Sequence, residues 1–373
     1  MASITGNDDI LVVSGWNSAF IFDRKSGAFQ SLDPPKSEDE NAETKGPKKG
    51  QTSSEHADKH MASLALSNCG QYLALASSRG TKSLFLWHRE GSTWKFVSQR
   101  ATGRAASRIR FTNSASSILV ADKAGDVYLF SVAEPLKEKE WLLGHITMLL
   151  DVLVSDDEKF VITCDRDDKI RVALYPNCYN IHSYCLGHTS FVTSLSFLPH
   201  NPAVLISTSG DGSVKFWNYL EGRELLSIPI DKHVQSSDDE VLPIKQCSSL
   251  KISTDSSLLS VCIGGSSICP IFKITGLDQL QMELVYKIDS EEGEIWWMQF
   301  TSDRNLFLLR NSPSRPVEVW RCSENLEMRL DENEKIFQDY SNLLQECFAC
   351  PSIPSMLYRK KFDEPPEKAK KKS

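Results

Sequence analysis

The sequence lacks the features by which a chain crosses a membrane or leaves the cell. None of its 373 residues falls in an apolar run of 18 or more, so no segment could span a bilayer as a helix. Asp8 and Asp9 stand where a secretory signal peptide would carry basic residues. The ten cysteines lie inside predicted strands or at irregular spacings, which is typical of buried thiols rather than of a disulfide framework. We therefore expect a soluble, non-secreted protein of a reducing compartment.

The motifs of common catalytic sites are also missing. Methyl transfer, hydride transfer and nucleotide hydrolysis need a glycine-rich loop or an equivalent cradle, and glycines such as Gly212 and Gly265 belong to hairpin turns or strand-rich segments. There is no G-x-S-x-G elbow and no H-E-x-x-H helix. Cys347 and Cys350 form a C-x-x-C pair without a second pair, so we interpret them as incidental thiols. We expect no catalysis and no cofactor or metal site in this chain.

Charge of one sign does not dominate either. Lys and Arg together number 42 against 49 Asp and Glu, a net charge of −7, which argues against a protein that grips nucleic acid over its whole surface. Two polar segments, 33–60 and 231–246, contain too few apolar residues to offset the entropy of ordering them. We expect both to be disordered surface insertions.

What the chain does contain is a repeat, and residues 187–217 (GHTSFVTSLSFLPHNPAVLISTSGDGSVKFW) form its most complete unit. A Gly-His pair precedes three short strands with an Asp-Gly turn, as in one blade of a WD-repeat propeller. In such a blade His188, Ser207, Asp211 and Trp217 can form one hydrogen-bonded chain. A chain of this kind satisfies buried polar groups that would otherwise each cost about 1–3 kcal/mol. We interpret these four residues as structural.

The ends of the third strands define the period of the repeat. Four of them are spaced by 43 or 44 residues, a period typical of propeller blades, and three more follow at wider intervals that contain insertions. The seven positions are Phe22, Trp87, Phe130, Ala173, Trp217, Phe272 and Trp320. The pattern predicts an all-β, seven-bladed propeller over residues 1–325, followed over 326–373 by a short amphipathic helix (334–347) and a lysine-rich tail. Ala173 replaces tryptophan in its blade, which predicts a shorter polar chain there. Residues 10–14 are the candidate for a terminal strand that closes the ring by pairing with the other terminus.

One turn is unusually charged. The segment DRDDKIR, residues 165–171, replaces the small residues of an ordinary blade turn with charges of both signs. Arg166, Lys169 and Arg171 could bind the carboxylates of a partner, because arginine forms bidentate pairs; a solvated turn is the alternative. Lys123 and Lys215 occupy related positions in the neighbouring blades, so a basic stripe along one rim is predicted.

A second basic cluster lies near the C-terminus and comprises Arg359, Lys360, Lys361 and the lysines of 368–372. It suits contact with RNA phosphates, whose affinity would depend on salt. A nuclear-import signal or a solubilising tail would have the same composition. The final lysine run contains no aromatic residue to stack on bases, which weakens the RNA interpretation.

Several of these segments together resemble a known family. VADKAGDVYLFSV (120–132), LGHITMLLDVLVSDDEKFVITCDRDDKIRV (143–172), CLGHTSFV (185–192) and SGDGSVKFW (209–217) are similar to the WD-repeat non-catalytic subunit of the eukaryotic tRNA (guanine-N(7)-)-methyltransferase. The resemblance is dense over residues 119–217 and sparse elsewhere, apart from SMLYRKKFD near the end. Cys164 stands where the family usually has alanine, a change between two small residues.

The resemblance implies a scaffold. Family members bind a Rossmann-fold catalytic subunit that carries S-adenosylmethionine, and the heterodimer methylates N7 of a guanosine in the variable loop of a subset of tRNAs. Carried onto this chain, the partner-binding corner would comprise Arg166, Asp167, Lys169 and Arg171, with Lys123 beside it. Arg171 would pair with an acidic residue of the catalytic subunit. The resemblance and the lysine tail together favour a nuclear protein, or one both nuclear and cytoplasmic.

The fold alone leaves another class of function open. Propellers host many unrelated roles, so the chain could instead be an adaptor that reads a peptide or a histone within a ubiquitin ligase or a chromatin complex. The two hypotheses differ in one measurable respect, because only the scaffold would raise tRNA methylation by a catalytic partner.

Overall fold

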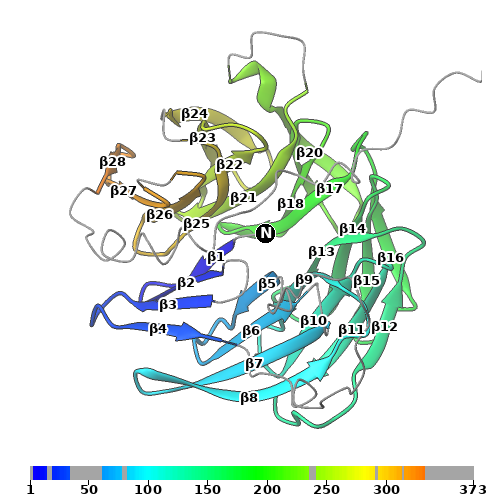
Figure 1. Ribbon diagram of the computed structural model, residues 1–373. Coiled ribbons are helices and arrows are strands. Elements are labelled where there is room, and N and C mark those ends of the chain that lie inside the picture. The colour runs from blue at the N-terminus through cyan, green and yellow to red at the C-terminus, as the bar shows by residue number, and fades with distance from the viewer. Residues whose placement is uncertain are drawn as a thin grey trace, which may run out of the picture.

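Short apolar strands form seven four-stranded antiparallel sheets around a common axis in the computed structural model (Figure 1). The structure describes residues 3–14, 19–33, 61–77, 82–234, 241–289, 293–312 and 315–331. Each sheet is built from four strands that are consecutive in the sequence. The predicted seven-bladed propeller is therefore confirmed.

The strands have the following bounds. The first three sheets comprise β1 (Ser3–Gly6), β2 (Ile10–Ser14), β3 (Ala19–Asp23), β4 (Phe29–Leu32); β5 (Met61–Leu66), β6 (Tyr72–Ser77), β7 (Ser83–Glu90), β8 (Thr93–Ala101); and β9 (Ala106–Phe111), β10 (Ser117–Asp122), β11 (Asp126–Ser131), β12 (Glu140–Gly144). The fourth and fifth comprise β13 (Leu149–Val154), β14 (Phe160–Asp165), β15 (Ile170–Leu174), β16 (Ile181–Cys185); and β17 (Val192–Leu198), β18 (Asn201–Ser209), β19 (Ser213–Asn218), β20 (Arg223–Pro229). The sixth and seventh comprise β21 (Ile244–Lys251), β22 (Ser256–Ile263), β23 (Cys269–Thr275), β24 (Gln281–Ile288); and β25 (Ile295–Phe300), β26 (Asn305–Arg310), β27 (Val317–Cys322), β28 (Met328–Leu330).

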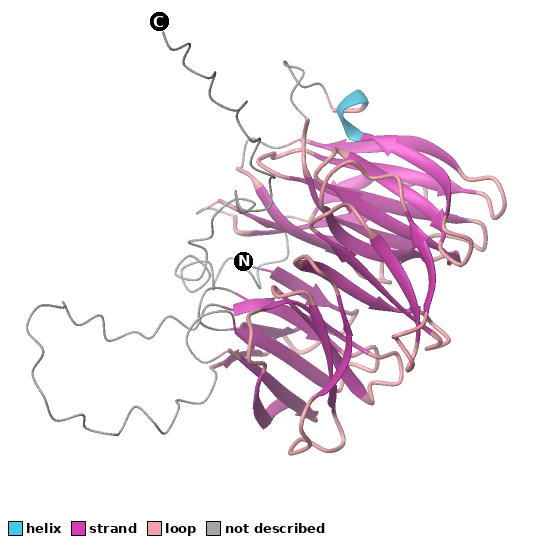
Figure 2. Cartoon of the chain, turned by 90° about the vertical axis from the view of Figure 1, so that its right-hand side faces the viewer, coloured by secondary structure: helices cyan, strands magenta, loops and turns pink. Residues whose placement is uncertain are grey.

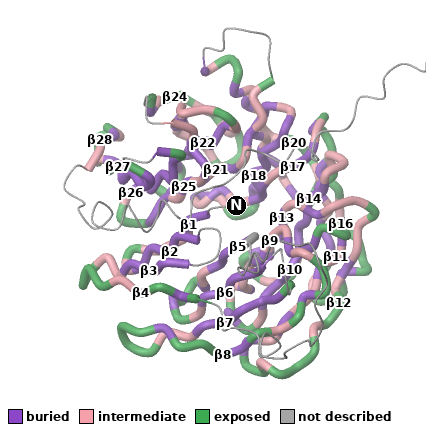
Figure 3. The backbone as a smooth tube through the Cα atoms, viewed as in Figure 1, coloured by how far each residue is buried: buried purple, intermediate pink, exposed green. Residues whose placement is uncertain are grey.

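The apolar core is divided among the seven gaps between neighbouring sheets. Strand β2 illustrates why: Ile10 and Val12 pack toward the second sheet, whereas Leu11 and Val13 pack toward the seventh. A strand buried on both faces must be apolar at every position, because successive side chains point to opposite faces. Burial is accordingly greatest in the inner and middle strands, while exposed residues concentrate in outer strands and loops (Figure 3).

The ring closes without an exchange of strands between the termini, so the prediction for residues 10–14 is wrong. This segment is β2, an inner member of the first sheet, and the first and seventh sheets each consist of their own four strands. Contacts between side chains close the seam instead. Arg24 lies 2.8 Å from Asp303, and the Asp303 amide donates to Asp8 at 3.1 Å. Apolar residues of β1, β2 and β3 pack against β25, β26 and β27 across the same seam.

Two predicted boundaries also need correction. The propeller extends beyond residue 325, because β28 is the fourth strand of the last sheet. The segment 231–246 is ordered at both ends. A 3-10 turn, η2 (Ile230–Lys232), overlaps its start, and β21 begins at Ile244. The buried side chains of Ile230, Val234 and Ile244 anchor these ends. The polar composition of the residues between them led to the prediction that the whole segment is disordered. Figure 2 shows η2 at the edge of the fifth sheet.

Other predictions lie outside the described residues. They concern the insertion 34–60, the helix 334–347 and the tail beyond it. Among the residues that the structure describes, no helix is long and apolar enough to cross a membrane.

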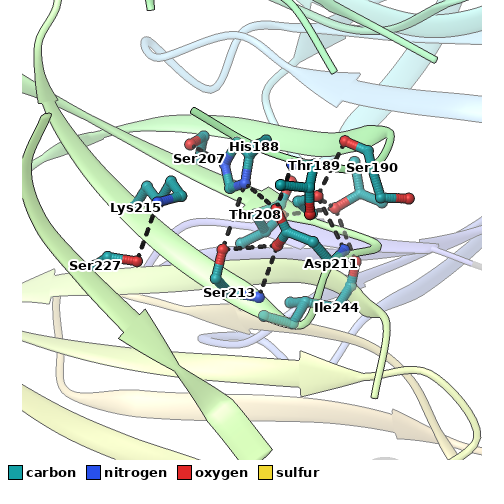
Figure 4. A network of polar contacts seen from close by, with 12 residues as sticks. His188, Thr189, Ser190, Ser207, Thr208, Asp211, Ser213, Lys215, Ser227 and Ile244 are labelled. Carbon is teal, nitrogen blue, oxygen red and sulfur yellow. Dashed lines mark hydrogen bonds and ion pairs between the residues drawn. The ribbon is translucent and has the colours of Figure 1, made fainter. Parts of the chain in front are cut away.

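The polar chain of the fifth sheet has the contacts that the sequence spacing predicts. Figure 4 shows three of its members, Ser207, His188 and Asp211. The Trp217 indole donates to Ser207 Oγ at 2.8 Å, and Ser207 Oγ lies 2.7 Å from His188 Nε2. His188 Nδ1 lies 2.8 Å from Asp211 Oδ2. An ionised carboxylate can only accept, so His188 Nδ1 donates to Asp211. Burial disfavours the charged form of Asp211, but the hydrogen bond from His188 holds its pKa below the usual range.

The fourth sheet has the shorter chain expected from Ala173. His145 Nδ1 lies 3.1 Å from Asp165 Oδ2, and Nε2 lies 2.8 Å from Thr163 Oγ1. Ala173 is buried and offers no donor, so the chain ends at Thr163.

We predict that Trp217→Phe destabilises the protein by about 1–3 kcal/mol more than Trp87→Phe. Both tryptophans are buried in the third strand of their sheet and lose the same atoms. Trp217 alone of the two donates an indole hydrogen bond to a described residue, so the difference isolates the effect on the polar chain. Urea unfolding of the two variants measures it. Equal destabilisation would show that the chain contributes nothing to stability.

Candidate functional site

The charged turn between β14 and β15 is held in shape by Asp165. Its Oδ1 accepts hydrogen bonds from the amides of Asp167 at 2.9 Å and Lys169 at 3.1 Å, while Oδ2 contacts His145. Burial alone would raise the pKa of Asp165, but these hydrogen bonds lower it below the ordinary value. Asp168 adopts a left-handed conformation with a φ of +70°. In the corresponding turns of the neighbouring sheets, glycines with positive φ, Gly125 and Gly212, are found instead. The turn is thus rigidly built although its side chains are charged.

Arg171 is the most constrained cation of this corner. It lies on β15, and its Nη1 donates to the Gly144 carbonyl at 3.1 Å. Its Nε is buried without a hydrogen-bond partner, and burial lowers the pKa of the guanidinium. Among the described residues, no carboxylate forms an ion pair with it. A half-buried arginine that lacks an anionic partner is a strong site for a carboxylate from another molecule.

The other predicted residues differ from Arg171 in how exposed they are and in whether they already form ion pairs. Lys123 and Lys169 are exposed, and within the described part of the chain neither forms an ion pair. Arg166 is 41% exposed and lies 3.9 Å from Asp167. The predicted stripe does not extend to Lys215, whose side chain is only 12% exposed and is bound to Glu224 at 2.7 Å and to Ser227. Its attraction to Glu224 on the adjacent strand was not evident from the turn pattern.

The loop that joins the third and fourth sheets brings Lys123 and Arg171 to one corner. The His145 amide donates to the Gly125 carbonyl at 2.7 Å, and the Arg166 amide donates to the Met148 carbonyl at 3.0 Å. Gly125 has a φ of +108°, and a Cβ there would lie 2.5 Å from the His145 carbonyl oxygen. Only glycine allows this close approach of the two backbones.

Sequence reasoning missed three apolar side chains at this corner. Ile146 is fully exposed in the loop, Trp141 is 59% exposed on β12, and Leu186 is 61% exposed just after β16. The Trp141 indole is oriented by a 3.0 Å hydrogen bond to Asp126. Exposed apolar residues beside arginine are typical of a protein interface. The one available signal was Ile146 directly after a Gly-His pair, where a loop residue is expected to be polar.

The weakly predicted RNA contacts, Arg359, Lys360 and Lys361, lie outside the described residues, as does the Cys347 and Cys350 pair. Within the described ranges, no group of three or more His, Cys, Asp or Glu side chains could hold a metal ion.

Solved structures with low sequence identity share this fold. A chain of the mitotic checkpoint complex superposes with a TM-score of 0.65 at 13% identity, covering 86% of each chain. The β-propeller domain of Cps50 (Swd1) from Myceliophteria thermophila gives 0.64 at 11% identity, covering 86% of this chain and 97% of that domain. These likenesses concern the fold alone.

Relatives by sequence share one description, non-catalytic subunit of tRNA (guanine-N(7)-)-methyltransferase. The human protein, WDR4, is 34% identical over 68% of this chain. The Culex quinquefasciatus protein, wuho, is 32% identical over 78%, and the zebrafish protein is 35% identical over 79%. The aligned regions cover 60%, 69% and 70% of these relatives, respectively.

The seven sheets and the polar chains of the fourth and fifth define a WD-repeat propeller. The family model for the tRNA methyltransferase TRM82 WD40 domain matches residues 25–140 and 131–308. The chain belongs to this family, that of the WD-repeat non-catalytic subunits of tRNA (guanine-N(7)-)-methyltransferase.

We predict that Gly125→Ala is more destabilising than Gly265→Ala by at least about 2 kcal/mol. Both glycines have positive φ, but a Cβ at Gly265 would meet nothing within 4 Å, whereas at Gly125 it meets the backbone of the loop carrying His145 and Thr147. Chemical unfolding compares the two variants. Equal free energies of unfolding would mean that the loop carrying His145 and Thr147 can move to accommodate the added methyl group, and that it does not fix the corner.

Proposed function

We propose that this chain is the scaffold subunit that binds and stabilises the catalytic subunit of a tRNA (guanine-N(7)-)-methyltransferase. One observation supports the place of binding more than any other: Arg171 is half-buried and, among the described residues, has no carboxylate partner, while the exposed Trp141 and Ile146 lie on either side of Gly144, whose carbonyl it contacts. Family membership supports the identity of the partner and favours it over a peptide or a histone.

The chemistry of the corner defines the surface that it would bind. The surface of the partner would present carboxylates to the four cations of the corner, Arg171, Arg166, Lys169 and Lys123. It would also present a hydrogen-bond donor to Asp167. An apolar strip next to those carboxylates would pack against the exposed side chains of Ile146, Trp141 and Leu186. Burial of the apolar strip would exclude water and strengthen the ion pair at Arg171. Loss of either partner would leave a buried charge unpaired, at a cost of about 2–5 kcal/mol.

In this proposal the chemical steps belong to the partner. The catalytic subunit holds S-adenosylmethionine and transfers its methyl group to N7 of a guanosine in the variable loop of a subset of tRNAs. This chain contributes a rigid corner, fixed by Asp165 and His145, against which the partner is held in its working shape. Basic residues Arg359, Lys360 and Lys361 add a salt-dependent contact to tRNA phosphates. The lysine tail and the substrate class favour nuclear residence.

We predict that Arg171→Leu lowers the affinity for the catalytic subunit by about 30-fold or more, the factor that corresponds to a loss of 2 kcal/mol. Arg223→Leu is the matched control, because Arg223 is 62% exposed and pairs with Glu221 of its own blade edge. Co-purification of the catalytic subunit, followed by titration of the purified pair, measures the effect. Undiminished recovery of the partner at high salt with Arg171→Leu would refute the role of this corner.

We also predict that this chain raises tRNA N7-guanine methylation when it is added to its isolated catalytic subunit, and that it has no such activity alone. The reason is that a partner held in its working shape spends less of its time in inactive conformations. A tRNA methylation assay with each subunit alone and with both together provides the measurement. A catalytic subunit that is equally active without this chain would favour the adaptor hypothesis.

A further inference from the structure

The propeller axis contains a cavity that the proposed partner surface does not use. It has a volume of about 290 Å³, a size at the lower end of the range for small-molecule sites. The inner strands of all seven sheets contribute to its wall, namely β1, β5, β9, β13, β17, β21 and β25. These strands surround the centre of the ring in Figure 1.

The charge of this wall has a single sign. Arg108 and Arg110, both from β9, are its two ionisable cations, and no Asp or Glu lines the cavity. The remaining polar groups are hydroxyls and amides, among them Thr5, Ser196 and Gln246. A narrow space with low-dielectric walls concentrates the field of the two guanidinium groups.

Asp151 lies behind the arginines and neutralises part of their charge. Its Oδ1 accepts from Arg108 Nε at 3.1 Å, and its Oδ2 accepts from Arg110 Nη2 at 2.9 Å. The amides of Val152 and Leu195 also donate to it. The carboxylate is buried, and the attraction of Arg108 and Arg110 outweighs its desolvation and lowers its pKa, so it remains ionised. Two cations and one saturated anion leave one net positive charge at the cavity.

Arg108 has donors that the described part of the chain does not use. Its guanidinium lies over the ring of Trp297 on β25, 5.0 Å from the centroid, so the side chain extends from the third sheet to the seventh. Its Nη1 and Nη2 form no hydrogen bond with any described residue. Burial lowers the pKa of Arg108, and its side chain keeps 14% of its surface exposed. An anion in the cavity could accept hydrogen bonds from these unused donors.

We propose that this axial cavity is a binding site for a small oxyanion, a phosphate or a carboxylate carried on a small molecule, held by the Arg108 and Arg110 guanidinium groups. Both anions match the planar fork of arginine, and the hydroxyl and amide groups of the wall supply further donors. The site is formed by this chain alone and is independent of any catalytic partner.

Isothermal titration of the full-length chain with inorganic phosphate, and separately with malonate, at constant ionic strength tests the proposal. Saturable binding of one anion per chain is expected for at least one of the two, with a dissociation constant on the order of millimolar or tighter. Comparison of the two isotherms distinguishes a phosphate site from a carboxylate site.

Ser196→Asp is the decisive variant, because it places a competing carboxylate in the cavity without removing the Arg108, Arg110 and Asp151 contacts. Ser196 makes one weak side-chain contact, to Cys247 Sγ at 3.7 Å, so its replacement leaves the ion pairs intact. Ser196→Asn is the matched control, because asparagine has nearly the same size as aspartate and carries no charge. We expect about tenfold weaker binding or more for Ser196→Asp, and a change within about threefold for Ser196→Asn.

Two results would overturn the proposal. One is the absence of saturable binding of both anions to the unmodified chain up to about 50 mM, far above the expected constant. The other is binding to Ser196→Asp as tight as to Ser196→Asn, which would place the anion elsewhere on the protein. Thermal unfolding of both variants without anion verifies that each is folded before the comparison is made.

Discussion

The structure depends on one constraint: every sheet is apolar on both faces and can bury them only against its two neighbours. Strand β2 shows the consequence within four residues, since Ile10 and Val12 need the second sheet while Leu11 and Val13 need the seventh. An open row of such sheets would leave two apolar faces in water, so the ring must close. Closure here relies on packing and on ionic contacts at Asp303 rather than on a shared strand. The seam therefore has the same apolar character as the other six gaps, supplemented by surface charges.

The repeat made most of the fold predictable, because period and turn chemistry act locally. The spacing of His188, Ser207, Asp211 and Trp217 was sufficient to predict their hydrogen bonds. Ring closure was not predictable in the same way, since the packing of residues 10–14 depends on a sheet 280 or more residues further along the chain. The end of the last sheet was missed for another reason: β28 has three residues, too few for an alternating pattern.

The charged corner around Arg171 shows the limits of reasoning from charge. DRDDKIR identified the turn, but the sequence could not show which cations were already paired. Lys215 forms an ion pair with Glu224 across adjacent strands, whereas the one hydrogen bond that Arg171 makes with a described residue is to the Gly144 carbonyl. The apolar part of the corner was hidden as well, because exposure of Ile146 and Leu186 results from where two loops lie in the ring. A charged side chain is available for binding when it lacks a partner in the folded state, and the residue type alone does not show this.

The same distinction separates the two kinds of polar group along this chain. His188 and Asp211 are satisfied by their own blade, and so their burial stabilises the fold and leaves nothing for a ligand. Arg171 and Arg108 are partly buried, yet the described residues satisfy only some of their donors. A folded protein retains such an arrangement at a cost, because desolvation of a guanidinium is repaid only when its donors are paired. The rim and the axis of this propeller thus each hold a guanidinium whose remaining donors an anion could satisfy. At the rim, exposed apolar side chains lie in the same corner as Arg171, a combination that suits a protein carboxylate. The axial cavity, of about 290 Å³, suits a small oxyanion.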